Sequence, residues 1–196
     1  MTQQIPDEEL VRRTCAGQRE AFDELVERYQ RRATSVSYRL LGNLHDALEV
    51  VQDAFIRAYR GLESLEDRPR FGSWLLRIVT NLSLNFRRDR AAGGPRLTLD
   101  DCIKDDDSPD RRAMLSDSDS SDQRPGAMLA AEELAEIVQK AMAELPDQQR
   151  LALVLFSIEQ MPQKEVAQIM GCSVEAVKWH VFQARKKLKD RLGDYM

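Results

Sequence analysis

Basic side chains gather between residues 178 and 191, and two large aromatic side chains lie among them. The basic residues are Lys178, Arg185, Lys186, Lys187, Lys189 and Arg191, and the one acidic residue in this range is Asp190. Trp179 and Phe182 lie within the same range. Cations neutralise the phosphates of nucleic acid, and apolar rings contact base methyl groups. The segment therefore predicts a surface that binds DNA.

The residues just before this segment predict a helix-turn-helix. Pro162 can begin a short helix that ends at Met170, and Gly171 can take the left-handed conformation that ends a helix. Ser173 can cap the next helix, with Glu175 in its first turn. A turn of three residues between two helices is typical of the DNA-binding motif, whose second helix enters the major groove.

A helical wheel of this second helix separates a buried side from an outer side. The apolar residues at spacings of three and four are Val174, Val177, Val181, Ala184 and Leu188. The outer and flanking residues, which we expect to contact DNA, are Glu175, Lys178, Trp179, His180, Phe182, Gln183, Arg185 and Lys186. A second interpretation stays open, in which Trp179 and Phe182 pack against the preceding helix or a neighbouring domain.

The N-terminal half also reads as helices. Asp7 can cap one helix, which is broken near Gly17, and a second helix follows Gly42. In residues 46–59 the apolar positions Ala47, Val51, Ala54, Phe55 and Ala58 share one side, and carboxylates occupy the other. In residues 71–90 the apolar side holds Trp74, Leu75, Ile78, Leu82 and Phe86, and arginines decorate the rest. The spacing of Trp74 places it in the core. A polar loop covers residues 66–69.

A long acidic segment separates the two halves. Residues 100–124 hold nine aspartates against one lysine and three arginines. These residues belong to a longer stretch, about residues 91–127, which opens with Gly93, Gly94 and Pro95 and shows little apolar periodicity, as is typical of a linker. Beyond it, residues 130–145 and 147–159 predict two more helices on either side of Pro146. We therefore predict an all-α protein of two small helical domains joined by a flexible acidic linker, with domain 1–91, linker 92–127 and a helix-turn-helix domain 128–196.

Composition excludes several other classes of protein. Cys15, Cys102 and Cys172 are far apart, so neither a disulfide framework nor a zinc site is indicated, and a reducing cytoplasm is expected. The longest apolar run, residues 151–158, is too short for membrane insertion. With only His45 and His180, no glycine-rich phosphate loop and no nucleophile motif, we expect no enzyme, no cofactor and no metal. The net charge of −4 limits DNA binding by the whole chain and leaves it to the basic end.

Four blocks in order along the chain resemble the extracytoplasmic-function (ECF) class of RNA polymerase sigma factors, in the sigma-70 family. They are residues 17–29, residues 46–55, residues 71–81, and a fourth block made of Leu145, Pro146 and Arg150 followed by residues 162–188. The variable acidic linker separates the third block from the fourth. Leu48 departs from the acidic residue that is usual at its position in the second block.

The resemblance implies roles for particular residues. It places Asp46, Glu49, Gln52, Asp53 and Phe55 on or beside a surface that binds the largest subunit of core RNA polymerase, and an acidic helix face suits a basic partner. It places Arg57, Leu65, Ile78 and Asn81 around a pocket for an extruded base of the minus-ten element, where Arg70, Arg77, Arg87 and Arg88 could follow the phosphates of the strand. The C-terminal helix-turn-helix is then the reader of the minus-thirty-five duplex.

The implied function is promoter-specific transcription initiation with core RNA polymerase, through its largest and second-largest subunits, in a stress or envelope response. Promoter DNA and an anti-sigma factor are the other implied partners, and catalysis belongs to the polymerase. For the linker, the resemblance suggests a path toward the polymerase cleft, and a merely solubilising tether is equally open. The alternative function is a stand-alone dimeric helix-turn-helix regulator, which binding to a palindrome would reveal. A purely structural helical adaptor is a third possibility, which leaves the exposed aromatic residues unexplained.

Overall fold

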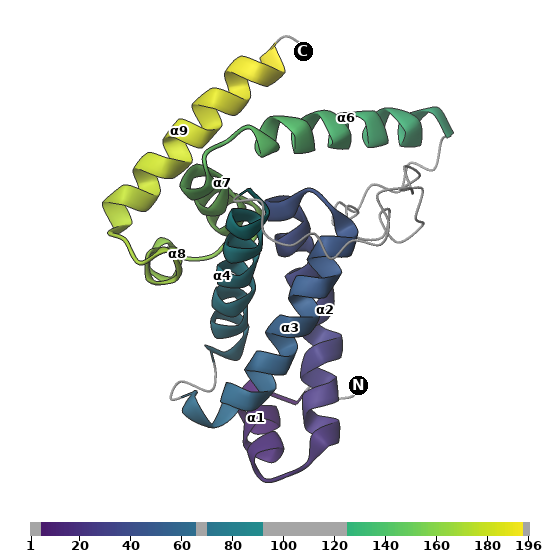
Figure 1. Cartoon of the computed structure of the whole chain (residues 1–196), viewed down its shortest axis with the longest axis vertical. Helices are drawn as coiled ribbons and strands as arrows, with labels where there is room; N and C mark the ends of the chain where they lie inside the picture. The colour runs from purple at the N-terminus through teal and green to yellow at the C-terminus, as the bar shows by residue number, and fades with distance from the viewer. Residues whose placement is uncertain (1–4, 66–69, 92–124, 194–196) are drawn as a thin grey trace.

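The structure is a computed structural model that describes residues 5–65, 70–91 and 125–193, with side chains from residue 134 onward in the last range. Across these ranges every regular element is helical, which confirms the predicted all-α fold. Figure 1 shows an N-terminal half built from α1 to α4 and a C-terminal half built from α6 to α9, which lies at one end of the first.

The N-terminal half holds four α-helices and a short 3-10 turn within its described residues. They are α1 (Asp7–Cys15), α2 (Arg19–Leu41), α3 (Leu44–Gly61), the 3-10 turn Leu62–Ser64 and α4 (Phe71–Ala91). Gly17 and Gly42 take positive φ angles of 92° and 79°, as their predicted places between helices require. Asp7 is not the N-cap of α1. Asp7 is the first residue of α1, so the N-cap is Pro6, and the Asp7 carboxylate contacts Arg28 and Tyr29.

The C-terminal half begins with a long helix that projects from the body (Figure 1). This helix is α6 (Pro125–Ala143), so helical structure starts inside the range predicted as linker, whose residues 92–124 lie outside the described residues. It is followed by α7 (Asp147–Leu153), a π-helical turn (Val154–Ile158), α8 (Gln163–Met170) and α9 (Val174–Leu192). Pro125 fits the preference of proline for the first turn of a helix, where no backbone N–H is needed.

The predicted buried side of α3 is confirmed, whereas that of α4 is partly different. Ala47, Val51, Ala54, Phe55 and Ala58 are all buried. In α4 the fully buried residues are Phe71, Leu75, Leu76 and Val79, while Trp74, Ile78, Leu82 and Phe86 are half-buried. The reason is that α4 packs on both α2 and α3, which covers a wider side of the helix than a single stripe.

One apolar core continues through both halves. It includes Leu25, Val36 and Leu75 from the first half and Leu155, Val166 and Val177 from the second. Helix α2 contacts both α6 and the π-helical turn. The two halves are therefore packed against each other, and this contact decides which surfaces of each half reach solvent.

Candidate nucleic-acid and protein interfaces

The turn between α8 and α9 has the geometry that the sequence predicts. Gly171 takes a φ of 63° after Met170, the last residue of α8. Ser173 then caps α9, because its Oγ accepts a hydrogen bond from the backbone N–H of Ala176 at 3.1 Å. The cap leaves a three-residue turn and fixes the direction in which α9 leaves α8. The two helices form a helix-turn-helix.

The outer side of α9 presents an apolar patch among cations. Val177, Val181 and Ala184 are buried beneath it, as predicted. Trp179 and Phe182 are 54% and 63% exposed, so they pack neither into the preceding helix nor against the other half. The interpretation that buries these two rings is therefore wrong. Since a folded protein gains nothing by exposing two large rings, a bound partner is the simplest reason for them.

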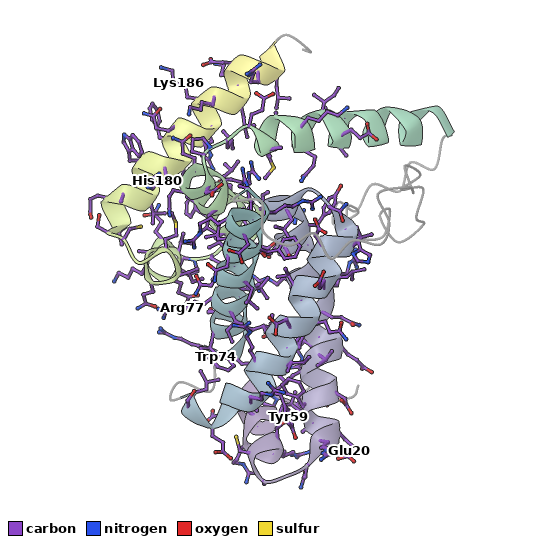
Figure 2. All side chains as sticks on the ribbon, in the orientation of Figure 1. Glu20, Tyr59, Trp74, Arg77, His180 and Lys186 are labelled. Carbon is purple, nitrogen blue, oxygen red and sulfur yellow. The ribbon has the colours of Figure 1, made fainter. Side chains whose placement is uncertain are left out.

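The other predicted contacts of α9 differ in their exposure. Glu175, Lys178, Arg185 and Lys186 are exposed, and Figure 2 marks Lys186 on this helix. Gln183 and His180 are half-buried, and the His180 ring packs edge-on against Trp179 with centroids 5.0 Å apart. Arg185 donates a hydrogen bond to Ser157 Oγ at 3.0 Å, which ties its guanidinium to the π-helical turn.

The predicted polymerase-binding residues lie on α3, with different exposure. Glu49 and Gln52 are exposed, and Asp53 is half-buried and pairs with Arg57 at 2.9 Å. Asp46 is buried, because Arg90 at the end of α4 pairs with its carboxylate. Phe55 is also buried. The acidic face of α3 that reaches solvent is therefore smaller than the sequence pattern suggests.

An apolar groove runs beside that acidic face, between α2 and α3. Among its lining residues are Phe22 and Val26 from α2, and Leu48, Gln52, Phe55, Ile56 and Tyr59 from α3. Leu48, Ile56 and Tyr59 are 49%, 44% and 42% exposed. None of these three residues was predicted to belong to a site, although Ile56 and Tyr59 lie eight and eleven residues after Leu48, which is the spacing of a second apolar stripe on the helix. Leu48, which departs from the acidic pattern, thus belongs to the groove.

The predicted minus-ten residues separate into two groups. Arg70, Arg77, Asn81 and Arg88 are exposed, and Figure 2 shows Arg77 pointing away from α4. Leu65 is buried, Ile78 is half-buried against the core, and Arg87 pairs with Asp147 of α7 at 2.9 Å. Arg57 extends from α3 and is held by Asp53. Residues 66–69, in the loop between α3 and α4, lie outside the described residues.

Arg150 connects the two halves from a buried position. It is 3% exposed and donates hydrogen bonds to the carbonyl oxygens of Leu40 at 2.8 Å and Leu145 at 3.2 Å, and to that of Ala143. Burial, together with the nearby Arg87, lowers the pKa of Arg150 to about 10. The guanidinium therefore stays protonated at neutral pH and carries its charge into the contact between the halves.

No helix within residues 5–65, 70–91 and 125–193 is long and apolar enough to cross a membrane. No group of three or more histidine, cysteine or carboxylate side chains in that part of the chain is arranged to hold a metal ion.

Comparison with known proteins identifies both halves of the chain. Residues 25–93 match sigma-70 region 2, and residues 135–188 match sigma-70 region 4. The ECF RNA polymerase sigma-E factor of Haemophilus influenzae is 32% identical over 197 residues, which cover 100% of each chain. The sigma-E factor of Escherichia coli strain K12 is 32% identical over 192 residues, covering 98% of this chain and 97% of its own.

Solved structures agree with these matches. CnrH, in complex with the cytosolic domain of CnrY, has a TM-score of 0.66 and 28% identity, covering 97% of this chain and 99% of that one. The sigma factor RpoE of Bartonella quintana, in complex with the anti-sigma factor NepR, shares the fold with a TM-score of 0.62 and 20% identity, covering 88% and 96% of the two chains. These matches do not favour a stand-alone dimeric regulator. The chain belongs to the ECF class of RNA polymerase sigma factors, in the sigma-70 family, which bind core RNA polymerase and direct promoter-specific transcription initiation.

Proposed function

We propose that this sigma factor reads the minus-thirty-five duplex with the outer side of α9. The observation that carries the proposal is the exposed pair Trp179 and Phe182 on the second helix of a helix-turn-helix. In the major groove such rings contact thymine methyl groups, while Lys178 and Lys186 contact the phosphates on either side. Glu175 and Gln183 offer the hydrogen-bonding groups that distinguish one base pair from another.

The groove between α2 and α3 is the proposed contact with the largest subunit of core polymerase. What supports it is the combination of exposed apolar residues and carboxylates, since Leu48, Ile56 and Tyr59 stand beside Glu49 and Asp53. An apolar groove with an acidic border suits a helix that has an apolar stripe and basic flanks. The apolar residues supply affinity, and the carboxylates steer the approach of a basic partner.

Helix α4 is the proposed reader of the minus-ten element. Arg77, Asn81 and Arg88 stand at spacings of four and seven, so they share one side of the helix and remain exposed. Arginines on that side can follow the phosphates of the single strand, and the asparagine can bond to a base that has left the stack. We place domain 1–91 at the polymerase and the minus-ten strand, domain 128–196 at the minus-thirty-five duplex, and the linker 92–127 between them.

An anti-sigma protein is a further proposed partner. The support is that CnrH, which is similar to this chain over nearly its whole length, was solved in complex with the cytosolic domain of another protein. An inhibitor that covers the groove of α2 and α3 would block the proposed polymerase contact. Catalysis of RNA synthesis is assigned to polymerase.

Promoter-directed transcription with purified core polymerase tests the proposed surfaces. We expect the substitutions Trp179→Ala and Phe182→Ala to weaken use of the cognate promoter about tenfold each, since burying a large apolar side chain contributes about 1.5–3 kcal/mol. Leu134→Ala is the matched control, because Leu134 is an exposed apolar residue of the same half, 57% exposed on α6. Unchanged promoter choice after both aromatic substitutions would contradict the base-contact assignment.

The polymerase contact needs a separate pair of variants. Combined Glu49→Gln and Asp53→Asn substitutions should lower affinity for core polymerase while leaving binding of the free chain to duplex DNA unchanged. The control combines Glu8→Gln and Glu20→Gln, which remove the same charge from exposed positions on α1 and α2 outside the groove. Equal loss of core affinity in the test and control pairs would show that only net charge matters.

A further inference from the structure

A line of aromatic rings joins α2 to the start of α4 and the end of α3. Tyr29 of α2 packs edge-on against Phe71, the first residue of α4, with ring centroids 5.5 Å apart. Phe71 in turn contacts Trp74, with centroids 6.0 Å apart. A Cβ atom added at Gly61, the last residue of α3, would lie 3.6 Å from Cζ2 of Trp74. The rings therefore lie between the two helix ends that residues 62–70 connect.

The Tyr29 ring also lies directly against the backbone of α4. A Cβ atom added at Gly72 would be 2.7 Å from Cε1 of Tyr29 and 2.9 Å from its hydroxyl oxygen, so glycine is what allows this close approach. Phe71, the neighbour of Gly72, is fully buried. Because a close-packed interior leaves little free volume, a tilt of the Tyr29 ring must displace the first turn of α4.

Helix α1 holds the other end of Tyr29. The Tyr29 hydroxyl donates a hydrogen bond to the carboxylate of Asp7, the first residue of α1. Arg28 pairs with the same carboxylate, and it also donates to the backbone oxygen of Ile5 at 2.9 Å and to Glu24 at 3.0 Å. The side chains of Asp7 and Arg28 are only 14% and 21% exposed, which limits competition from water. A hydrogen bond to an ionised acceptor is stronger than a neutral one, so Asp7 fixes the hydroxyl in place.

The elements that these contacts position are the ones that carry the proposed minus-ten residues. Helix α1 contacts both α4 and the 3-10 turn Leu62–Ser64. Leu65 directly follows that turn, and Figure 2 shows Trp74 near the N-terminal end of α4. Ile78 and Asn81 lie about one and two turns after Trp74 on the same helix. The separation of the turn from α4 therefore sets the space between Leu65 and the two residues of α4.

We propose that Tyr29 is a positioning residue for minus-ten recognition. Held by Asp7, its ring sets the separation of the 3-10 turn and α4 through Phe71 and Trp74, and so the space offered to an extruded base. Tyr29 acts through these side chains and not by touching DNA. The contacts that capture a base must offset the cost of unstacking it, and such contacts need their groups placed to within about 0.5 Å. This inference rests on the proposed function of α4 as the reader of the minus-ten element.

The first test measures base extrusion by the holoenzyme, formed from core polymerase and the full chain. The probe is a promoter duplex with aminopurine, a fluorescent base analogue, placed in turn at each position of the non-template minus-ten strand. Tyr29→Phe keeps the ring and removes the bond to Asp7. We expect the equilibrium constant for extrusion to fall about fivefold, the effect of one lost hydrogen bond. Affinity for core polymerase and for a duplex with the minus-thirty-five element alone should not change.

Ser37→Ala is the matched control, because it removes another hydroxyl from α2, eight residues beyond Tyr29. Ser37 is fully buried, and its Oγ lies 3.1 Å from that of Ser83, away from the line of rings. The control should leave extrusion unchanged. Equal losses of extrusion in Ser37→Ala and Tyr29→Phe would overturn the proposal, because they would assign the effect to a general loosening of α2. Unchanged extrusion in Tyr29→Phe would overturn it as well.

The second test asks whether Tyr29 acts through Asp7. Asp7→Asn keeps an oxygen that can accept from the Tyr29 hydroxyl, so it should retain more extrusion than Asp7→Ala. In the Asp7→Ala background, Tyr29→Phe should cause no further loss, because the bond that it removes is already absent. A further loss equal to that in the wild-type background would contradict the role of the bond.

Asn81→Ala separates failure of this inference from failure of the proposed function. Asn81 is exposed on α4 and is a proposed contact with the extruded base. Unchanged extrusion in Asn81→Ala would contradict the reading of the minus-ten element by α4, and this inference would fall with it. Reduced extrusion in Asn81→Ala, together with unchanged extrusion in Tyr29→Phe, would overturn the positioning role alone.

Discussion

Replacing Arg150 with methionine should destabilise the C-terminal half of the protein more than the N-terminal half. The guanidinium donates to the carbonyl oxygens of Ala143 and Leu145 in the turn before α7, and to that of Leu40 at the end of α2. Two of the three acceptors thus belong to the half that contains Arg150, and one belongs to the other half. Methionine fills a similar volume and offers no donor, so each of these oxygens loses its charged partner.

The size of the effect follows from two opposing contributions. A hydrogen bond from a charged donor contributes about 1.5 kcal/mol or more, so three of them contribute roughly 4–5 kcal/mol. Against this, removing a guanidinium that is 3% exposed recovers a desolvation cost of a few kcal/mol. The lowered pKa of Arg150, about 10, shows that burial already acts against its charge. We therefore expect a net loss of about 2 kcal/mol in the free energy of unfolding.

Native-state hydrogen exchange gives the change for each half, because amides report local opening free energies. Protection should fall most in peptides from α7 to α9, less in peptides from the end of α2, and hardly at all in α1. Arg185→Met is the control, since Arg185 is exposed and should lose less than about 0.5 kcal/mol. Protection in Arg150→Met equal to that of the wild type would refute the reasoning, because it would mean that desolvation cancels all three bonds.

Three further predictions concern single positions. Gly72→Ala should cost about 2 kcal/mol, measured by urea denaturation, because an added Cβ would lie 2.7 Å from Cε1 and 2.9 Å from the hydroxyl of Tyr29. Burial and the hydrogen bond to Asp7 raise the pKa of Tyr29 from 10 to about 12, so its contribution to stability is complete below pH 10 and is lost as the pH rises toward 12. In the Tyr29→Phe variant the unfolding midpoint should not fall in this way as the pH rises from 10 to 12. A fall equal to that of the wild type would contradict the prediction. Ser173→Ala should lower stability by about 1 kcal/mol through loss of the cap on α9, and thermal unfolding that matches the wild type would exclude that role.

The helix-turn-helix could be predicted from sequence because its signals are local. Gly171 ends a helix through its own backbone freedom, and Ser173 caps the next through a hydrogen bond only three residues away. The apolar stripe of α9 follows from its 3.6-residue period. Each of these features depends on neighbours within one or two turns, so the sequence contains all the information that they need.

The side of α3 that reaches solvent depends on a partner that the local sequence does not contain. Asp46 is polar and begins an acidic face, yet it is buried, because its carboxylate pairs with Arg90. That residue lies 44 residues later, on another helix. Leu48 is apolar yet exposed, because the groove beside α2 stays open. Periodicity shows which residues share a side, whereas the packing of α4 and α2 decides which side is covered.

The contact between the halves is the part that sequence reasoning could not reach, and the π-helical turn shows why. Residues 154–158 contain neither glycine nor proline, so nothing in them marks a change from α-helical hydrogen bonding. The π-helical turn takes up about one more residue than an α-helical turn. An unbroken α-helix would therefore rotate Glu159 by about 100° around the axis and turn it away from α2. The pairing of Glu159 with Arg32 spans 127 residues and depends on that single shift in register. A small local choice of backbone geometry, stabilised by apolar packing from both halves, therefore decides whether the arginines of α2 face a carboxylate or solvent.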